Sequence, residues 1–420
     1  MGHLVGKDLY RKLGRKIDNL SARAPWNDTL YAILKELYTP DEAELVVKMP
    51  YGLSTIEQLE KGTCIDSARL EKLLDGLCEK GLVMDVWVRD SYRYTVSPLL
   101  IGVFEFTMMR TRGQLNTKEW ARLFHDYLQD SSTFYQANCG HGQSVSALRT
   151  IPYVEALDDT ARVEILDYES AAAIVDNAKV AAIGICSCRH EKLHAGEKHC
   201  DTPLETCSSF DDAAETLIRH GMARQVTREE MRDNLSRSRE SGLVLCADNV
   251  RNNISFICHC CGCCCNVLLG ISRFGYPNIV VTSNYLAQVN ADECIQCGQC
   301  VEACPIHAID DNDPSGMPYV NEAFCLGCGV CALRCRSESL RLVSRVKRVY
   351  CPEDTFERVI MQCLDQGTLQ NILFREPGNI SHAFLRGFVG GVLKLAPVKR
   401  ALLGDRLRSR FVSALRNAAN

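Results

Sequence analysis

Two copies of one cysteine spacing constrain this 420-residue chain more than any other feature. Each copy has four cysteines, which are separated in turn by two, two and three residues. Every cysteine of the first copy has a counterpart in the second copy at the same distance along the chain. A fixed repeat of this kind indicates duplication of one structural unit. Thiols at such short intervals are typical of metal-binding loops, so the segment is predicted to fold around bound metal. The first copy is Cys294, Cys297, Cys300 and Cys304, and the second is Cys325, Cys328, Cys331 and Cys335.

This spacing is the one that binds [4Fe–4S] clusters. Three thiolates of a short loop bind three corners of the cube, and the distant cysteine of the other copy binds the fourth. We therefore predict two clusters, one held by Cys294, Cys297, Cys300 and Cys335, the other by Cys325, Cys328, Cys331 and Cys304. Zinc is the alternative, but zinc sites usually pair Cys-x2-Cys motifs across a long spacer.

The segment from about Val289 to Val343 resembles the bacterial ferredoxin domain that carries two [4Fe–4S] clusters, on its cysteine runs and on Pro305 after the first run. Arg336 stands where that proline would recur. The loop glycines suit a backbone that comes close to a cluster and points N–H groups at its sulfurs; they are Gly298, Gly327 and Gly329. The resemblance implies the small α+β ferredoxin fold and a function in electron transfer.

A second cysteine-rich region lies upstream. It consists of two cysteine-rich elements, and a strand-like apolar run over residues 180–185 leads into the first of them. Between the two elements the sequence predicts helices over 210–224 and 227–241 and a strand over 242–245. The paired motif resembles that of a group of iron–sulfur proteins of anaerobes, in which it precedes a two-cluster ferredoxin domain. We expect one or two further iron–sulfur clusters here. The ten candidate ligands are Cys186, Cys188, Cys200, Cys207, Cys258, Cys260, Cys261, Cys263, Cys264 and Cys265.

The ligand assignment among these ten thiols stays open. The four cysteines of the first element could close one site, each element could contribute two ligands to a shared site, or residues 258–265 could hold a larger cluster. Cysteine could instead bind zinc together with His190, His194, His199 or His259, or the thiols could be buried and free of metal. Arg189, beside Cys188, is expected to be solvated, and donation to a cluster sulfur is the alternative.

Composition is ordinary for a globular protein, with 46% hydrophobic and 24% charged residues. The chain has no apolar signal segment after its basic start and no run of membrane-spanning length. So many cysteines in such a chain suit a reducing compartment. We expect a cytoplasmic protein of an organism that lives with little oxygen. A net charge of −4 predicts no general affinity for nucleic acid.

The N-terminal third carries no recognisable chemistry. Four helices are predicted over residues 27–38, 41–48, 54–61 and 66–80, with a capping box of Ser54 and Glu57, followed by a two-stranded wing over 83–96. This order resembles a winged-helix domain over residues 28–98. That span has 8 basic and 13 acidic residues, which disfavours DNA binding and favours protein docking. An apolar helix is expected to continue over 99–130.

Both ends of the chain are basic and have apolar residues at roughly helical spacing. Residues 380–416 have eight basic side chains against Asp405 alone, interrupted by glycines and Pro397. A basic amphipathic helix of this kind packs on its own protein, docks on an acidic partner or lies on the inner face of a membrane.

The sequence predicts an α+β multidomain protein. The expected parts are a basic N-terminal helix over 1–27, a winged-helix-like domain with following helices over 28–135, an α/β cysteine-rich domain over 150–288, a two-cluster ferredoxin domain over 289–345 and a helical basic tail over 346–420. No dinucleotide fingerprint, phosphate loop or catalytic triad stands out, so catalytic residues stay unknown.

Our leading hypothesis is a polyferredoxin-type relay that exchanges electrons with redox partner proteins, as a subunit of an anaerobic oxidoreductase complex. A reductase with its own catalytic cluster within residues 186–265 is the first alternative. A winged-helix regulator that senses redox state is the second.

Overall fold

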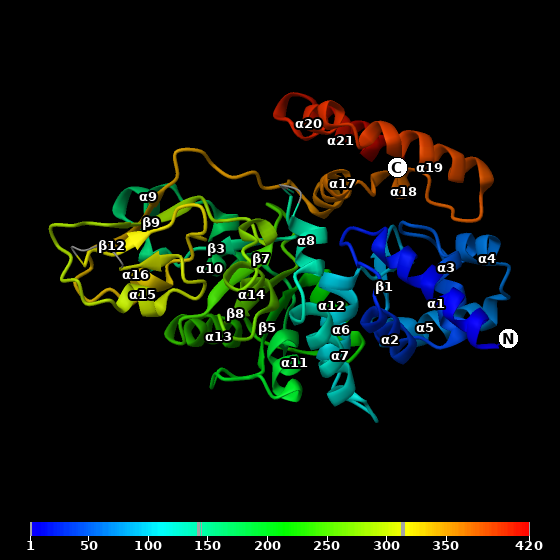
Figure 1. The fold of residues 1–420 in the computed structure, drawn as a ribbon, viewed down its shortest axis with the longest axis horizontal. Helices are drawn as coiled ribbons and strands as arrows, with labels where there is room; N and C mark the ends of the chain where they lie inside the picture. The colour runs from blue at the N-terminus through cyan, green and yellow to red at the C-terminus, as the bar shows by residue number, and fades with distance from the viewer. Residues whose placement is uncertain (1, 141–142, 144, 312–315, 420) are drawn as a thin grey trace. The chain divides into compact units, whose positions relative to one another are not determined.

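We describe the protein from a computed structural model that covers residues 2–140, 143, 145–311 and 316–419. The chain forms two compact units, which we describe separately (Figure 1). The first comprises residues 1–145 and 356–420, and the second comprises residues 146–355. The helical C-terminal tail therefore belongs to the same compact unit as the N-terminal helices.

The N-terminal part of the first unit is helical and ends in a hairpin. The helices are α1 (Gly2–Asp18), α2 (Asp28–Leu37), α3 (Pro40–Lys48), α4 (Ile56–Thr63) and α5 (Ser67–Glu79). Strands β1 (Val83–Val88) and β2 (Ser91–Val96) pair antiparallel around Arg89 and Asp90. Both turn residues have positive φ, at 52° and 60°, as a tight two-residue hairpin loop requires. The predicted helices and wing are all present in this order.

The capping box of α4 lies one residue later than predicted. Thr55 accepts a hydrogen bond from the Gln58 N–H, and the Gln58 side chain accepts one from the Thr55 N–H. Ser54 cannot cap this helix because its backbone pairs with Tyr94 of β2, through N···O distances of 3.0 and 2.9 Å. The prediction of Ser54 and Glu57 was wrong for this reason.

The predicted apolar helix over 99–130 is broken into two. Residues 99–103 form an irregular turn in which Ile101 is left-handed, with φ 54°. Helix α6 (Phe104–Met109) then ends before the polar stretch that contains Gly113, whose φ is 87°. Helix α7 (Thr117–Gln129) follows, and then α8 (Thr133–Cys139). A continuous helix was the wrong prediction, because a left-handed glycine cannot continue an α-helix.

The C-terminal part of the first unit is wholly helical. Its elements are α17 (Thr355–Gln366), α18 (Leu369–Leu373), α19 (Ile380–Leu393), α20 (Ala396–Leu403) and α21 (Asp405–Ala419). Ile360, Met361 and Leu364 of α17 form a buried core with Leu393 of α19 and Val412 of α21. In the part of the chain that the structure describes, no helix has the length and apolar character needed to cross a membrane.

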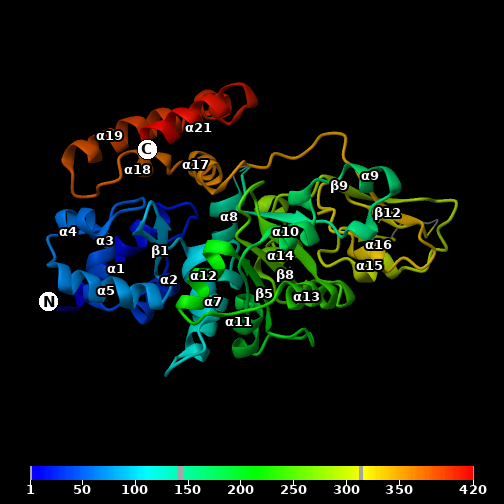
Figure 2. The same cartoon turned by 180° about the vertical axis from the view of Figure 1, so that it is seen from behind.

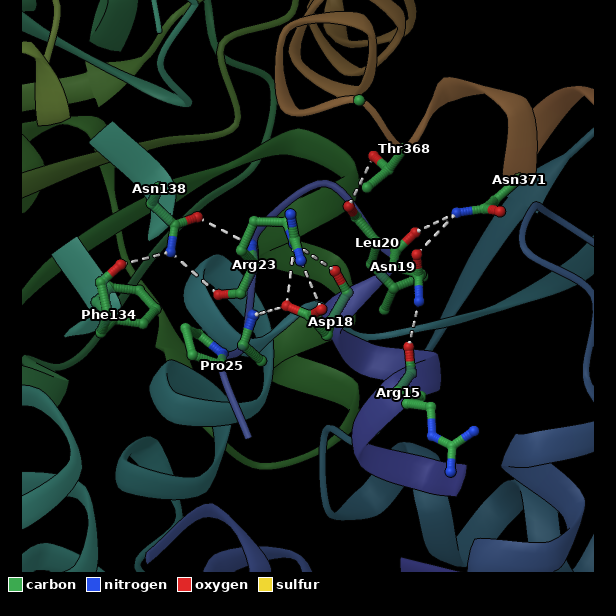
Figure 3. Close-up of polar contacts among 12 residues, drawn as sticks. Arg15, Asp18, Asn19, Leu20, Arg23, Pro25, Phe134, Asn138, Thr368 and Asn371 are labelled. Carbon is green, nitrogen blue, oxygen red and sulfur yellow. Dashed lines mark hydrogen bonds and ion pairs between the residues drawn. The ribbon is translucent and has the colours of Figure 1, made fainter. Parts of the chain in front are cut away.

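A polar network ties the end of α1 to α8 and to α18 (Figure 3). The Arg23 guanidinium donates to both carboxylate oxygens of Asp18, at 2.7 and 3.0 Å. The Asn138 side chain accepts a hydrogen bond from the Arg23 N–H and donates one to the Arg23 carbonyl. Thr368 donates to the Leu20 carbonyl at 3.0 Å, and Asn371 donates to the Asn19 carbonyl at 3.2 Å. The loop after α1 therefore joins residues far apart in the sequence.

The second unit is built on a six-stranded sheet of order β3-β7-β8-β5-β4-β6. Its neighbouring strands β8 and β5 are labelled in Figure 2. Its strands are β3 (Leu148–Ile151), β4 (Ala181–Ile185), β5 (Glu205–Phe210), β6 (Ala223–Gln225), β7 (Val244–Asp248) and β8 (Phe256–Cys260). All five strand pairings are antiparallel. The middle domain is therefore α+β, and the α/β prediction was wrong, because helices between strands can also return the chain to antiparallel neighbours.

Five α-helices lie between these strands in the sequence and a sixth follows β8. They are α9 (Asp159–Glu164), α10 (Ala171–Asn177), α11 (Ser187–Ala195), α12 (Asp211–Arg219), α13 (Arg228–Glu240) and α14 (Asn266–Ser272). The helix predicted over 210–224 ends at Arg219, because Gly221 adopts φ 68° and the chain then forms β6.

The ferredoxin-like segment closes the second unit. Strands β9 (Tyr285–Val289) and β12 (Leu340–Ser344) pair antiparallel and bring its two ends together. Between them lie α15 (Gln299–Ala303), the short pair β10 (Ile309–Asp310) and β11 (Tyr319–Val320), and α16 (Val330–Leu333). The two helices therefore occupy equivalent places in the two repeats.

Substituting Asp18 with alanine tests the network after α1. The change removes the acceptor for Arg23 and for the Ala24 N–H, and both side chains of the ion pair are partly exposed, at 35% and 23%. We expect a loss of about 1–2 kcal/mol in the free energy of unfolding. The melting temperature of the iron-loaded protein should fall by several degrees in calorimetry.

The matched control is Asp8→Ala on the same helix. Asp8 pairs with Lys12, and both side chains are more than half exposed. This variant should have the same melting temperature as the parent protein. Equal shifts in the two variants would contradict the stabilising role of the Asp18 network.

Candidate metal centres

Four cysteines line a cavity inside the ferredoxin-like segment, which we name the inner cavity. They are Cys304, Cys325, Cys328 and Cys331. Apolar side chains complete the wall, among them Ile306, Leu326 and Leu342, with Val244 from β7 of the six-stranded sheet. Cys304, Cys325 and Cys331 are at most 8% exposed. The inner cavity is therefore held between the ferredoxin-like loops and the larger sheet.

A second cavity lies nearer the surface, and we name it the outer cavity. It is lined by Cys294, Cys297, Cys300 and Cys335, together with Ile295, Leu340 and other residues of the segment. Cys297 is exposed, and the other three thiol-bearing residues are partly buried. Cys304 and Cys335 each line the cavity of the opposite repeat. This is the grouping that the sequence predicts, and the assignment of iron ligands itself stays a prediction.

Backbone N–H groups point at the sulfurs of the inner cavity. The Ala308 N–H donates to Cys304 Sγ at 3.2 Å, and the N–H groups of Ile306 and Ile309 also hydrogen-bond this sulfur. N–H donors around a thiolate stabilise its negative charge and tune a bound cluster. Four converging thiols with N–H donors in an apolar cavity fit a [4Fe–4S] cluster.

The acidity of the thiols differs between the two cavities. Burial raises the pKa of Cys328 to about 12 and holds the pKa of Cys331 well above its usual value. Burial acts in the same direction on Cys335, but hydrogen bonds with Ser339 and Ser337 lower its pKa below the usual value. Because thiolates bind metal, metal entering the inner cavity must displace thiol protons that burial holds there.

The upstream cysteines divide into two sets. The first, which we name the inner thiol set, lies on β5, β7 and β8 and at the starts of the helices α11 and α14. The Cys258 thiol hydrogen-bonds with Cys207 and Cys260, and the Cys265 thiol with Cys188 and Cys260. Cys186 lies close enough to Cys188 and Cys207 to interact electrostatically. The members are Cys186, Cys188, Cys207, Cys246, Cys258, Cys260 and Cys265.

Cys246 is a member that sequence analysis missed. It lies on β7 directly opposite Cys258 of β8, and its thiol hydrogen-bonds with Cys260. A single cysteine in an apolar strand gives no spacing signal. Its position could have been found only from the register of β7 against β8.

The second set, which we name the tetrathiol set, consists of Cys200, Cys261, Cys263 and Cys264. Their four Sγ atoms lie within 4.8 Å of one another. The structure thus separates Cys200 from Cys186, Cys188 and Cys207, with which the sequence could have grouped it in one site. Leu243 packs against this set as an apolar neighbour.

The histidines of this region do not join the tetrathiol set. His259 is 2% exposed, and its ring nitrogens bond Ser208 at 2.8 Å and Ser238 at 2.6 Å. Burial lowers the pKa of His259 to about 3. His190 and His194 face each other with 3.0 Å between their Nε2 atoms. His259 therefore has a structural environment in which both ring nitrogens are occupied.

Arg189 is fully buried, against the expectation of a solvated side chain. It donates to the His259 carbonyl at 2.9 Å and to Cys261 Sγ at 3.8 Å, and it contacts Thr206. It lies in the first turn of α11, where Ser187, His190 and Glu191 are buried as well. Arg189 supplies a positive charge beside the thiols.

The upstream cysteines adjoin the inner cavity. A Cβ atom on Gly262 would lie 2.5 Å from the carbonyl oxygen of Pro305, so the loops that carry Cys261 and Cys304 are in direct contact. Cys246 of the inner thiol set interacts electrostatically with Cys328 of the inner cavity. The inner thiol set and the tetrathiol set therefore both lie beside the inner cavity.

Comparison with known proteins agrees with the ferredoxin-like geometry. Residues 287–310 match the family model of the 4Fe-4S binding domain. The chain is 27% identical over 124 residues to an uncharacterized ferredoxin of Methanocaldococcus jannaschii, an alignment that covers 29% of this chain and 73% of that protein. It is 39% identical over 51 residues to the polyferredoxin-like subunit of an aliphatic sulfonate oxidoreductase of Pyrococcus furiosus, covering 12% of this chain and 30% of that subunit.

No solved structure matches the chain. The family match and the two relatives support an iron–sulfur protein of ferredoxin type with a role in electron transfer. The matched family segment contains the first cysteine run, and the structure gives the second run an equivalent loop and helix.

Two equivalent glycines allow a matched test of the inner cavity. Gly329 and Gly298 precede α16 and α15 and have φ values of 88° and 70°. An added Cβ at Gly329 would lie 2.6 Å from Ala156 Cβ, whereas the same atom at Gly298 meets nothing within 4 Å. Alanine therefore strains the backbone by about 1 kcal/mol at both positions, and overpacking adds about 1–3 kcal/mol at Gly329 alone.

We expect Gly329→Ala to lower the melting temperature and the iron content of protein purified without oxygen. Gly298→Ala should retain its iron and show a smaller shift. Colorimetric iron and acid-labile sulfide assays, with calorimetry, measure both quantities. Equal losses in the two variants would show that the tight packing around Gly329 does not support the inner cavity.

Proposed function

We propose that this protein relays electrons between redox partner proteins through two [4Fe–4S] clusters. Cys294, Cys297, Cys300 and Cys335 would hold one cluster, and Cys304, Cys325, Cys328 and Cys331 the other. A cluster bound in this way supplies reversible one-electron transfer at a potential set by its surroundings. The observation that carries the proposal is the pair of four-cysteine cavities, each completed by a thiol of the opposite repeat.

The difference in burial between the cavities supports a direction of approach for a partner. Cys297 is exposed, and its neighbour Ile295 is 62% exposed on the same loop. The inner cavity is enclosed by apolar walls and by β7. A partner protein can therefore come near the outer cavity, while the inner cavity faces the upstream cysteines.

The inner thiol set would hold a third iron–sulfur cluster. Four of its members lie on β5, β7 and β8, and the other three lie at or just before the starts of α11 and α14. The hydrogen bonds among their thiols show that the sulfurs converge. Such convergence of seven thiols is not needed for packing a sheet. The electrostatic interaction of Cys246 with Cys328 would place this cluster beside the inner cavity.

The N-terminal domain would act as a protein-docking module of the winged-helix type. The bridge between Ser54 and Tyr94, together with the order of α3, α4, α5 and the hairpin, supports this assignment. The acidic balance of residues 28–98 disfavours phosphate binding and therefore the redox-sensing regulator.

A larger assembly is the expected setting of the relay. The similarity to a polyferredoxin-like subunit supports a role as a subunit of an oxidoreductase. The many cysteines suit the reducing cytoplasm of an anaerobe. Helix α19 carries a row of exposed apolar side chains at four-residue spacing, Ile380, Phe384, Phe388 and Val392. A row of this kind suits contact with a partner subunit or with the inner face of a membrane.

A reductase with its own catalytic cluster is the second candidate. The inner thiol set contains seven cysteines, and a cube binds four, so thiols would remain beside the cluster. A free thiolate next to iron can enter chemistry on a substrate. Turnover of a disulfide or thioester substrate by the isolated chain, with an artificial electron donor, would favour this candidate over the relay.

Serine substitutions at Cys297 and Cys328 test the relay. Each removes one predicted ligand, so the iron content should fall by about four atoms per chain in each variant. The rate at which dithionite-reduced protein reduces cytochrome c should fall at least tenfold. Cys64→Ser is the control, because Cys64 is exposed and lies in the other compact unit. Unchanged transfer rates in both ligand variants would rule out the relay.

A further inference from the structure

The sulfur separations in the tetrathiol set are short. Cys200 Sγ lies 3.9 Å from Cys261 Sγ and 3.8 Å from Cys264 Sγ, and the Sγ atoms of Cys263 and Cys264 are 3.5 Å apart. A tetrahedral metal ion with metal–sulfur bonds of about 2.3 Å places its four sulfurs about 3.8 Å from one another. The tetrathiol set therefore has the dimensions of a site for a single metal ion.

These dimensions differ from those of a cubane site. In a cubane cluster each cysteine thiolate binds a different iron. The cysteine sulfurs therefore lie farther apart than they do around a single metal ion, because the iron atoms stand between them. Among the residues that the structure describes, the tetrathiol set alone brings at least three metal-ligand atoms within 4.8 Å of one another. The eight cysteines of the inner and outer cavities surround larger spaces.

The chain builds this site from a tight turn and one distant residue. Cys261, Cys263 and Cys264 lie on the turn between β8 and α14, which the Cys265 N–H closes by donating to the Cys261 carbonyl at 3.2 Å. Cys200 comes from the loop between α11 and β5. Metal binding would fasten this loop to the turn.

The surroundings suit several negative charges. Four thiolates around a divalent ion leave a net charge of about −2. The buried Arg189 guanidinium donates to Cys261 Sγ at 3.8 Å, and the Cys264 N–H hydrogen-bonds the same sulfur. Arg189 Nε has no hydrogen-bond partner in the part of the chain that the structure describes. A buried cation of this kind offsets charge that the low-dielectric interior disfavours.

We propose that Cys200, Cys261, Cys263 and Cys264 bind one zinc ion, separately from the iron–sulfur clusters. Thiolates bind zinc more tightly than ferrous iron in the usual order of divalent metals. Four protein ligands close the coordination sphere, so the ion has a structural role and no open position for a substrate. It would fix the turn that contacts Pro305, next to Cys304 of the inner cavity.

Metal analysis of the full chain, purified without oxygen and with its clusters, tests this proposal. Mass spectrometry of the metals should find one zinc per chain beside the iron. Cys263→Ser should lose at least nine-tenths of the zinc and keep its iron and acid-labile sulfide. Cys64→Ser is the control and should keep both metals, since Cys64 is remote from these thiols in the sequence and exposed.

If Cys263→Ser does not fold, a second variant still tests the proposal. Cys200→His retains a zinc ligand, so it should keep zinc, and after growth on cobalt its absorption bands should shift from those of a four-sulfur site. Three results would overturn the proposal. They are wild-type protein without zinc, a mononuclear iron in place of zinc, and loss of about four irons with sulfide from Cys263→Ser.

The zinc proposal and the relay fail independently. Loss of zinc with unchanged iron tests the tetrathiol set alone, whereas loss of iron from Cys297→Ser and Cys328→Ser tests the ferredoxin-like cavities alone. The two outcomes are read from the same metal analysis.

Discussion

Each cavity of the ferredoxin-like segment is completed by a thiol from the opposite repeat, and the rest of the second unit is arranged around this exchange. Cys304 reaches the loop of Cys325 to Cys331, and Cys335 reaches the loop of Cys294 to Cys300. The pairing of β9 with β12 holds the two ends of the segment together. Bound clusters would therefore stabilise both repeats at once.

The six-stranded sheet brings the upstream cysteines to the same region. Strands β5, β7 and β8 and the starts of α11 and α14 carry the inner thiol set, and β7 also contributes Val244 to the wall of the inner cavity. The contact of Gly262 with Pro305 joins the tetrathiol turn to the loop of Cys304. The predicted metal sites at the sheet and in the ferredoxin-like loops thus share one scaffold, which suits a protein that positions several redox groups in series.

The sequence predicted features that depend on local spacing, and it missed those that depend on tertiary structure. The cysteine runs, the helices α2 to α5 and the hairpin after them follow from spacing and periodicity. The partner of Cys200 lies 61 residues away at Cys261, and Cys246 meets Cys258 only through strand register. The burial of Arg189 and the break after Met109 depend likewise on packing and on a left-handed glycine.

Iron and acid-labile sulfide per chain, measured with low-temperature electron paramagnetic resonance of the reduced protein, test the central claim most directly. The two cavities predict at least about eight irons and eight sulfides, and a spectrum broadened by magnetic coupling between neighbouring clusters. About four irons or fewer in protein purified without oxygen, with the narrow spectrum of an isolated cluster, would contradict the two-cluster account.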